Sequence, residues 1–253
     1  MGSKAILEWS YIPSDLIDGV LDFEKYGGKM VAQDGRAKAE FDECDYRADT
    51  DLAGKLLQAL QAKIAPIERR KHRAAQFSTL PTLTVMRSDG VSEVYLEGNA
   101  SVTITEHLVL QLIRDGVVIV DSAQERADEE MRQGEKLERH ADDALLSRML
   151  ASHRNAMNDR NDEFVHLYEI LDALEKKFGK LHRVADALAF DVSRLRAFQA
   201  CCNTPTTASR HRGNVSGPLR SPTQGEYETA RSVAWDLVMA YATFLDSHCT
   251  GSA

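Results

Sequence analysis

The chain has 253 residues, of which 43% are hydrophobic and 28% are charged. This composition is typical of globular domains and excludes a collagen-like, low-complexity or wholly disordered chain. The length allows one large domain or two small ones. A uniformly acidic surface with the formal net charge of −8 would repel nucleic acid and anionic membranes. Whether the charge is uniform therefore matters for function.

Cysteine usage and hydropathy predict a cytoplasmic protein with no membrane partner. The four cysteines are too few for a stapled secreted domain and form no C-x-x-C pair. We find no apolar stretch typical of a signal peptide, and no run approaches the roughly 18 apolar residues of a membrane helix. The spacing of His and Cys indicates no metal site. The P-loop, G-x-S-x-G and H-E-x-x-H motifs are absent, so we expect no cofactor.

Residues 1–122 are predicted to form an α+β domain. Apolar residues at three- and four-residue spacing indicate one main helix over Asp51–Arg73. Asp-Gly turns and alternating apolar residues predict hairpins, because Gly and Asp favour the backbone of tight turns. Since strands and helices do not alternate, we expect an antiparallel sheet with the helix on one face. The predicted strands are Met30–Gln33, Arg36–Glu43, Thr82–Arg87, Val91–Glu97, Ser101–Thr105, His107–Ile113 and Val117–Asp121.

Residues 123–253 are predicted to form an all-α domain, a helical bundle that follows the sheet. A long, charged helix over Gln124–His153 would connect it to the first domain. The strongest amphipathic stripe lies between Phe164 and Phe178 and ends at Gly179, a common helix stop. The other predicted elements are helices Leu181–Ala189, Ser193–Cys202 and Glu226–Ser247, with a loop over Asn203–Thr223.

The charge is strongly segregated along the chain. Residues 180–222 carry seven basic and two acidic residues, although the whole protein is acidic. A second basic cluster, Arg69–Arg73, lies at the end of the first predicted helix. There we expect a solvated cap, because cations stabilise a helix C-terminus through its dipole. The basic segment 180–222 is therefore the part of the chain where a polyanion would bind.

The segment Val184–Phe198 resembles the helix-turn-helix of DNA-binding proteins. That resemblance implies that Ser193 caps the second helix and that arginines on the pair contact phosphates or guanine edges. One departure is Ala189, where the family usually has a turn glycine. Plain helix packing is the alternative. The residues assigned to the helix contact are Ala185, Leu188, Leu195 and Phe198, and the candidate nucleic-acid-binding residues here are Arg183, Arg194 and Arg196.

Arg160-Asn161, followed by His166, resembles the Arg-x(4–6)-His motif of HEPN-type helical domains, many of which are metal-independent ribonucleases and often dimers. The resemblance implies that His166 moves the 2′-hydroxyl proton and that Arg160 stabilises the phosphate. Helical spacing directs His166 away from the apolar stripe, which suits a catalytic residue or a plain surface histidine. Composition alone predicts roughly two such matches, and Arg148 with His153 is the second.

The segment Arg210-His211-Arg212-Gly213 lies in a loop rich in Pro, Gly and Ser. Two arginines in such a loop suit an anion such as a phosphate. The alternative is that these arginines pair with the acidic helix around Glu125–Glu138. Together with the sequence around His166 and with Phe178-Gly179, this loop resembles bacterial proteins of unassigned role. That resemblance implies no activity.

Three functions follow from these patterns, and whether the protein is an enzyme stays open. The first is a cytoplasmic protein that binds nucleic acid or another polyanion through its C-terminal helical domain. The second is a HEPN-type metal-independent ribonuclease acting as a toxin or defence component. The third is a non-enzymatic assembly subunit, since long charged helices often mediate contacts with a protein partner or a second copy of the chain.

Overall fold

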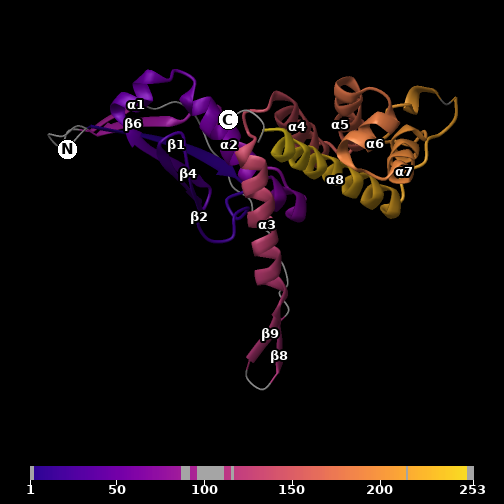
Figure 1. The fold of residues 1–253 in the computed structure, drawn as a ribbon, viewed down its shortest axis with the longest axis horizontal. Coiled ribbons are helices and arrows are strands. Elements are labelled where there is room, and N and C mark those ends of the chain that lie inside the picture. Colours follow the sequence, from indigo (N-terminus) through magenta and orange to yellow (C-terminus); the bar gives the residue numbers. More distant parts are fainter. Residues whose placement is uncertain (1–2, 87–91, 96–110, 115–116, 215, 250–253) are drawn as a thin grey trace. The chain divides into compact units, whose positions relative to one another are not determined.

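The protein is an α+β protein in which an antiparallel sheet is followed by a helical region (Figure 1). The computed structural model describes residues 3–86, 92–95, 111–114, 117–214 and 216–249. The chain divides into two compact units, Met1–Glu138 and Arg139–Ala253. The division therefore falls later than the boundary at residues 122 and 123 that the sequence suggests.

The sheet of the N-terminal unit is antiparallel throughout. Within the described residues its order is β2-β3-β4-β1-β6-β7, and β5 also pairs with β1. A separate antiparallel pair consists of β8 and β9. The predicted strand Ser101–Thr105 and part of His107–Ile113 lie outside the described residues. The strands are β1 (Lys4–Ile12), β2 (Leu21–Lys25), β3 (Gly28–Gln33), β4 (Arg36–Asp42), β5 (Gln76–Phe77), β6 (Thr82–Met86), β7 (Ser92–Tyr95), β8 (Gln111–Arg114) and β9 (Val117–Asp121).

β1 is a central strand of this sheet and was not among the predicted strands. Ala5, Leu7, Trp9 and Tyr11 alternate along it and are all buried. These side chains point to one face, because successive residues of a strand face opposite sides of the sheet. β1 thus supplies a large part of the apolar face on which the domain is built.

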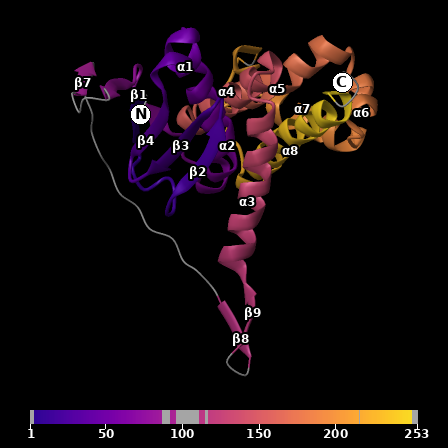
Figure 2. The same ribbon diagram turned by 60° about the vertical axis from the view of Figure 1, so that its left-hand side comes forward.

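One helix, α2 (Leu52–Lys71), covers this apolar face (Figure 2), as predicted; a shorter helix, α1 (Glu43–Ala48), precedes it. Leu56, Leu60 and Ile64 recur at helical spacing on α2 and are fully buried in the same core as the sheet residues. Their burial removes water from both apolar surfaces, and this stabilises the N-terminal unit.

A second helix, α3 (Ser122–Arg139), packs closely against α2. A Cβ atom at Gly134 would lie 2.3 Å from the backbone oxygen of Lys63, so only glycine allows this approach. The contact is flanked by an ion pair between Lys25 and Glu138, 2.8 Å apart. α3 therefore belongs to the N-terminal unit and not to the helical domain.

The long helix predicted over Gln124–His153 is wrong, because two helices, α3 and α4 (Ala144–Asn158), occupy this stretch. Asp143 marks the start of the second helix. Its carboxylate accepts hydrogen bonds from the backbone N–H groups of Leu145 (3.0 Å) and Leu146 (2.8 Å). An aspartate in this position caps a new helix N-terminus, and the chain turns there before α4 begins.

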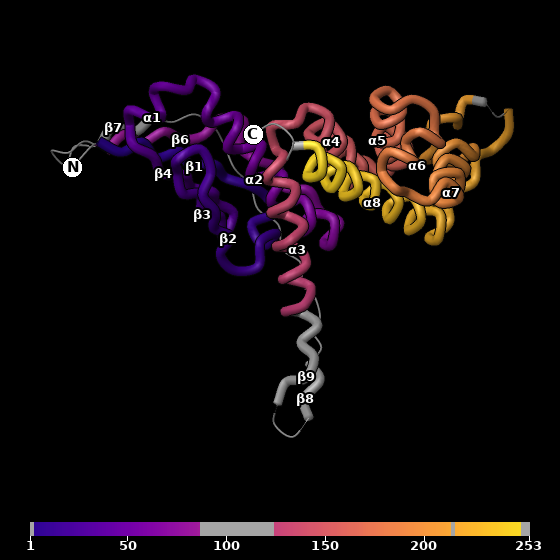
Figure 3. Tube along the Cα trace, in the orientation of Figure 1, coloured from indigo at the N-terminus to yellow at the C-terminus, as the bar shows by residue number. Residues whose placement is uncertain are grey.

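The C-terminal unit is a bundle of helices (Figure 3), as predicted. Two of them organise it: α5 and α8 contact each other, and both contact α4, α6 and α7. The predicted stripe of α5 is buried at Phe164, Leu167, Leu171 and Leu174. Besides α4, its elements are α5 (Glu163–Phe178), α6 (Leu181–Leu188), α7 (Val192–Asn203), the 3₁₀ turn η1 (Arg212–Asn214) and α8 (Gln224–Cys249).

Candidate functional site

α6 and α7 form a helix pair joined by a short turn, at the place where the sequence resembles a helix-turn-helix. Ala189 adopts φ 49°, the left-handed conformation that favours the glycine usual at this position. The N–H of Phe190 closes the end of α6 by donating to the oxygen of Ala185 at 2.8 Å. The predicted cap Ser193 is wrong: α7 begins one residue earlier, and Asp191 caps it by accepting from the N–H of Ser193 at 2.7 Å.

The apolar positions that the resemblance assigns to this helix pair are all buried. Burial fixes the two helices against the rest of the bundle, and it leaves their remaining faces in solvent. α6 and α7 also contact α5 and α8. Helix packing alone accounts for the burial of these four residues, which are Ala185, Leu188, Leu195 and Phe198.

The three arginines of α6 and α7 have different surroundings. Arg194 forms an ion pair with Asp236 of α8 at 2.5 Å, and its guanidinium lies 5.2 Å from the ring centre of Phe190. Arg183 and Arg196 are exposed, and within the described residues neither forms an ion pair or side-chain hydrogen bond. Two of the three arginines are therefore open to a ligand, whereas Arg194 is already bound within the unit.

His166 lies on the first turns of α5, and Arg160 is exposed in the turn before that helix. The imidazole is 22% exposed and has a carboxylate on each side: Asp159 is 3.9 Å from Nε2, and Glu169 is 3.6 Å from Nδ1. Ser152 donates a hydrogen bond to Glu169 at 2.8 Å. A phosphodiester approaching His166 would meet this negative charge, which would raise its free energy there.

Arg210 and Arg212 are bound to carboxylates of the α5 region and not to the helix around Glu125–Glu138. Arg210 lies 3.1 Å from Asp172 and stacks over the ring of Tyr168, with 4.3 Å between guanidinium and ring centre. Arg212 forms an ion pair with Asp162, and its hydrogen bond holds the pKa of that carboxyl below its usual value. The two arginines predicted to bind an anion are therefore already paired with carboxylates of their own unit.

The structure brings some of the predicted site residues together and separates others. Arg212 forms an ion pair with the Asp162 carboxylate, and the backbone N–H of His166 donates to the Asp162 backbone oxygen at 3.0 Å, so the loop and the HEPN-like motif meet at the start of α5. His211 is half-buried between the two paired arginines. Arg196 lies on α7, a different helix. The predicted residues thus form two groups. Around α5, Arg210 and Arg212 are paired and Arg160 is exposed; on α6 and α7, Arg194 is paired and Arg183 and Arg196 are exposed.

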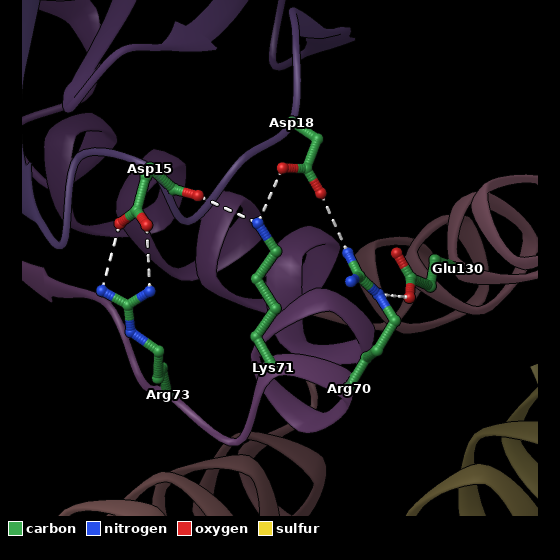
Figure 4. Close-up of polar contacts among 6 residues, drawn as sticks. All are labelled: Asp15, Asp18, Arg70, Lys71, Arg73 and Glu130. Atoms are coloured by element: carbon green, nitrogen blue, oxygen red, sulfur yellow. Dashed lines mark hydrogen bonds and ion pairs between the residues drawn. The ribbon is translucent and has the colours of Figure 1, made fainter. Parts of the chain in front are cut away.

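The second basic cluster, at the end of α2, is a network of ion pairs and not the solvated cap that we predict (Figure 4). Its cations bind carboxylates from the loop after β1 and from α3, and the side chain of Lys71 is only 6% exposed. His72 ends the helix with φ 48°. The contacts are Arg70 with Asp18 (3.1 Å) and with Glu130, Lys71 with Asp18 (2.8 Å), and Arg73 with Asp15 through two bonds of 3.1 Å.

A buried ion pair at the start of α5 was not among the predicted contacts. Glu163 is fully buried and forms two hydrogen bonds with Arg231 of α8, at 2.5 and 2.9 Å. The guanidinium of Arg231 also lies 5.0 Å from the ring centre of Tyr227. The partners are 68 residues apart, so no local pattern could have indicated the pair.

The cysteines and the metal-ligand residue types provide no further site in the described part of the chain. Cys44, Cys201 and Cys202 are free thiols, and burial raises the pKa of Cys201 and of Cys202. A raised pKa keeps a thiol protonated and unreactive. In the same residues no group of three or more His, Cys, Asp or Glu is arranged to hold a metal ion.

Neither the described helices nor similarity to known proteins indicates a function. Across the described helices, none combines the length and the hydrophobicity that crossing a membrane requires. No protein-family model, curated protein or solved structure matches the chain. A functional proposal for this protein therefore depends on the chemistry of its own residues.

Proposed function

We propose that the C-terminal unit binds nucleic acid through the exposed face of α6 and α7. The observation that carries this proposal is the exposure of Arg183 and Arg196, one on each helix, without an ion pair among the described residues. The other four arginines of the basic segment are paired: Arg194, Arg210, Arg212 and Arg220 bind Asp236, Asp172, Asp162 and Glu226. An unpaired arginine can bind a phosphate without first losing a carboxylate.

The position of the two arginines supports contact with a phosphodiester backbone. Lys180, the exposed residue immediately before α6, adds a third cation to the same helix pair. The pair itself is held by buried residues such as Leu195 and Phe198, so the cations project from a fixed scaffold. Backbone contacts of this kind position a protein on nucleic acid without reading its sequence.

The acidic net charge limits where such binding can occur. The protein carries −8 overall, whereas residues 180–222 carry an excess of basic residues. Nucleic acid would therefore be repelled by most of the surface and held at this segment. Each phosphate contact releases counterions, so the affinity should fall steeply as salt rises.

The test is fluorescence anisotropy of a labelled DNA duplex and a labelled single-stranded RNA at about 50 mM salt, where backbone contacts are strong. We expect wild-type binding, and a loss of roughly ten-fold in affinity in the double variant Arg183→Ala plus Arg196→Ala. The matched control is Arg36→Ala plus Arg132→Ala, which removes two exposed arginines from the N-terminal unit.

Two results would contradict the proposal. One is the absence of binding by the wild-type protein to both probes at this salt concentration. The other is an equal loss of affinity in the two double variants, because binding would then depend on net charge and not on α6 and α7. The preference between DNA and RNA is an outcome of the same titrations.

A further inference from the structure

We infer that Asp162 and Asp172 mask a second phosphate-binding site, formed by Arg210 and Arg212, and that the nucleic acid bound at α6 and α7 replaces these carboxylates. The inference rests on the proposed function for its ligand. The two arginines belong to the segment that follows α7, residues 204–214, which we call the strap. Asp172 and Asp162 of the α5 region hold the strap through these two arginines.

The strap places both arginines on a fixed base. Thr206 and Ser209 are fully buried, and the Ser209 hydroxyl accepts from the Thr206 N–H at 3.0 Å and donates to its oxygen at 3.2 Å. Ala208, between them, is 2% exposed. Arg210 and Arg212 follow directly. Their positions are therefore set by a buried turn, and they do not depend on the carboxylates alone.

Each guanidinium is held by groups that a phosphate would leave in place. Arg210 lies over Tyr168, whose hydroxyl accepts a hydrogen bond from Gln199 at 3.1 Å. Arg212 donates to the backbone oxygen of Asn161 at 3.1 Å. The ring and the backbone oxygen are neutral, so they orient the arginines without neutralising them. Asp162 and Asp172 contact the guanidinium groups directly and compete with a phosphate for the positive charge, and Asp159 adds a further attraction at Arg212.

Both ion pairs are open to solvent, which makes them replaceable. The side chains of Arg210 and Asp172 are 34% and 48% exposed, and those of Arg212 and Asp162 are 42% and 34% exposed. Exposed ion pairs contribute little to stability, because water and salt screen them. A phosphate brings a similar charge and bidentate geometry, and a polyanion that is already held at α6 and α7 presents its phosphates at a high effective concentration.

The test is the double variant Asp162→Asn plus Asp172→Asn, which keeps the shapes of both side chains and removes their charge. We expect its affinity for the labelled DNA duplex or RNA to rise roughly five-fold over wild type, because the two side chains, now neutral, no longer compete with a phosphate for Arg210 and Arg212. The salt dependence should become steeper by up to roughly one unit for each arginine released. Thermal unfolding of the variants shows whether the fold is kept.

The matched control is Glu8→Gln plus Asp22→Asn, which removes two exposed, ion-paired carboxylates from the N-terminal unit. It changes the net charge equally, so it should reproduce only the general electrostatic gain. Adding Arg210→Ala and Arg212→Ala to the Asp162 and Asp172 variant should remove the specific gain. The inference is overturned if the two double variants gain equally, or if the gain survives without the arginines.

The outcomes separate this inference from the proposed function. A loss in the Arg183 and Arg196 variant, without a specific gain in the Asp162 and Asp172 variant, supports the function and overturns the inference. A specific gain, without a loss in the Arg183 and Arg196 variant, supports a site at the strap and contradicts the proposed role of α6 and α7. The absence of binding by wild type and by both double variants overturns both.

Discussion

The end of α2 and the strap are both basic in sequence, and in both regions the cations bind carboxylates that are distant along the chain. They differ in the burial of Lys71 and Arg73, since Arg70 is as exposed as Arg210. At the end of α2 the side chain of Lys71 is 6% exposed, and Arg73 makes two hydrogen bonds to Asp15 (Figure 4). In the strap, Arg210 and Arg212 remain open to solvent. A basic run in a sequence therefore indicates neither a ligand site nor a structural network until the burial of its cations and the bonds that hold them are known.

The same contrast occurs between two neighbouring residues at the start of α5. Glu163 is fully buried against Arg231, whereas Asp162 is half-exposed beside Arg212. Removing charges from water costs free energy that only a well-placed partner offsets. The buried pair should therefore be structural, and the exposed pair should be replaceable.

The largest expected effect comes from breaking the buried ion pair between Glu163 and Arg231. Arg231→Met leaves the Glu163 carboxylate buried without its partner, so we expect the free energy of unfolding to fall by about 3 kcal/mol. Arg212→Met removes an exposed partner and should change it little. Chemical denaturation of both variants measures the difference. Equal losses in the two variants would contradict the division into structural and replaceable pairs.

A smaller effect is expected from the exposed ion pair between Arg220 and Glu226, which also caps the start of α8. Glu226 accepts hydrogen bonds from Arg220, at 2.6 and 2.8 Å, and from the N–H of Thr223 at 2.8 Å, and these lower its pKa to about 2. A lowered pKa gives stability that is present above the unfolded-state value, near 4.5, and is lost as pH falls towards 2. We expect Glu226→Gln to cost about 1 kcal/mol above pH 5.

The measurement is unfolding by denaturant between pH 7 and about pH 2, the range in which this carboxyl titrates. The gap in stability between wild type and Glu226→Gln should be constant above about pH 5 and should close as the pH falls. The matched control is Glu228→Gln, two residues further along the same helix, whose carboxylate accepts a hydrogen bond from the neutral side chain of Gln224. A gap that does not change with pH would show that Glu226 acts through shape and not through charge.

Much of the fold could be predicted from the sequence, because periodicity reports which residues face a core. The α2 and α5 helices follow from apolar residues at helical spacing, and the β3–β4 hairpin follows from Asp34-Gly35. The strand β1 carries the same kind of signal, since Ala5, Leu7, Trp9 and Tyr11 alternate along it, although it is not among the predicted strands. The break before α4 depends on the capping aspartate, Asp143, which the continuous charged pattern obscured.

Less of the candidate site could be predicted, because its properties depend on contacts between distant residues. The sequence indicated which residues are basic and which helices carry them. It did not indicate that Arg194 binds Asp236 and Arg212 binds Asp162, whereas Arg196 stays open. Pairing over such separations is decided by the packing of whole helices, and only the structure distinguishes occupied arginines from available ones.

The smallest expected effect concerns the turn at Ala189, which positions the exposed arginines of α6 and α7. In the strap the arginines are held by ion pairs and a buried turn, whereas those of α6 and α7 depend on the backbone at Ala189. A non-glycine residue at φ 49° is strained, and glycine removes that strain but gains freedom in the unfolded chain. We expect Ala189→Gly to stabilise the protein by about 0.5 kcal/mol without changing nucleic-acid affinity. The matched control, Ala197→Gly in the interior of α7, should destabilise it by a similar amount. Thermal and chemical unfolding measure both changes. Destabilisation by Ala189→Gly would mean that the Ala189 side chain, and not its backbone conformation, holds α6 and α7 together.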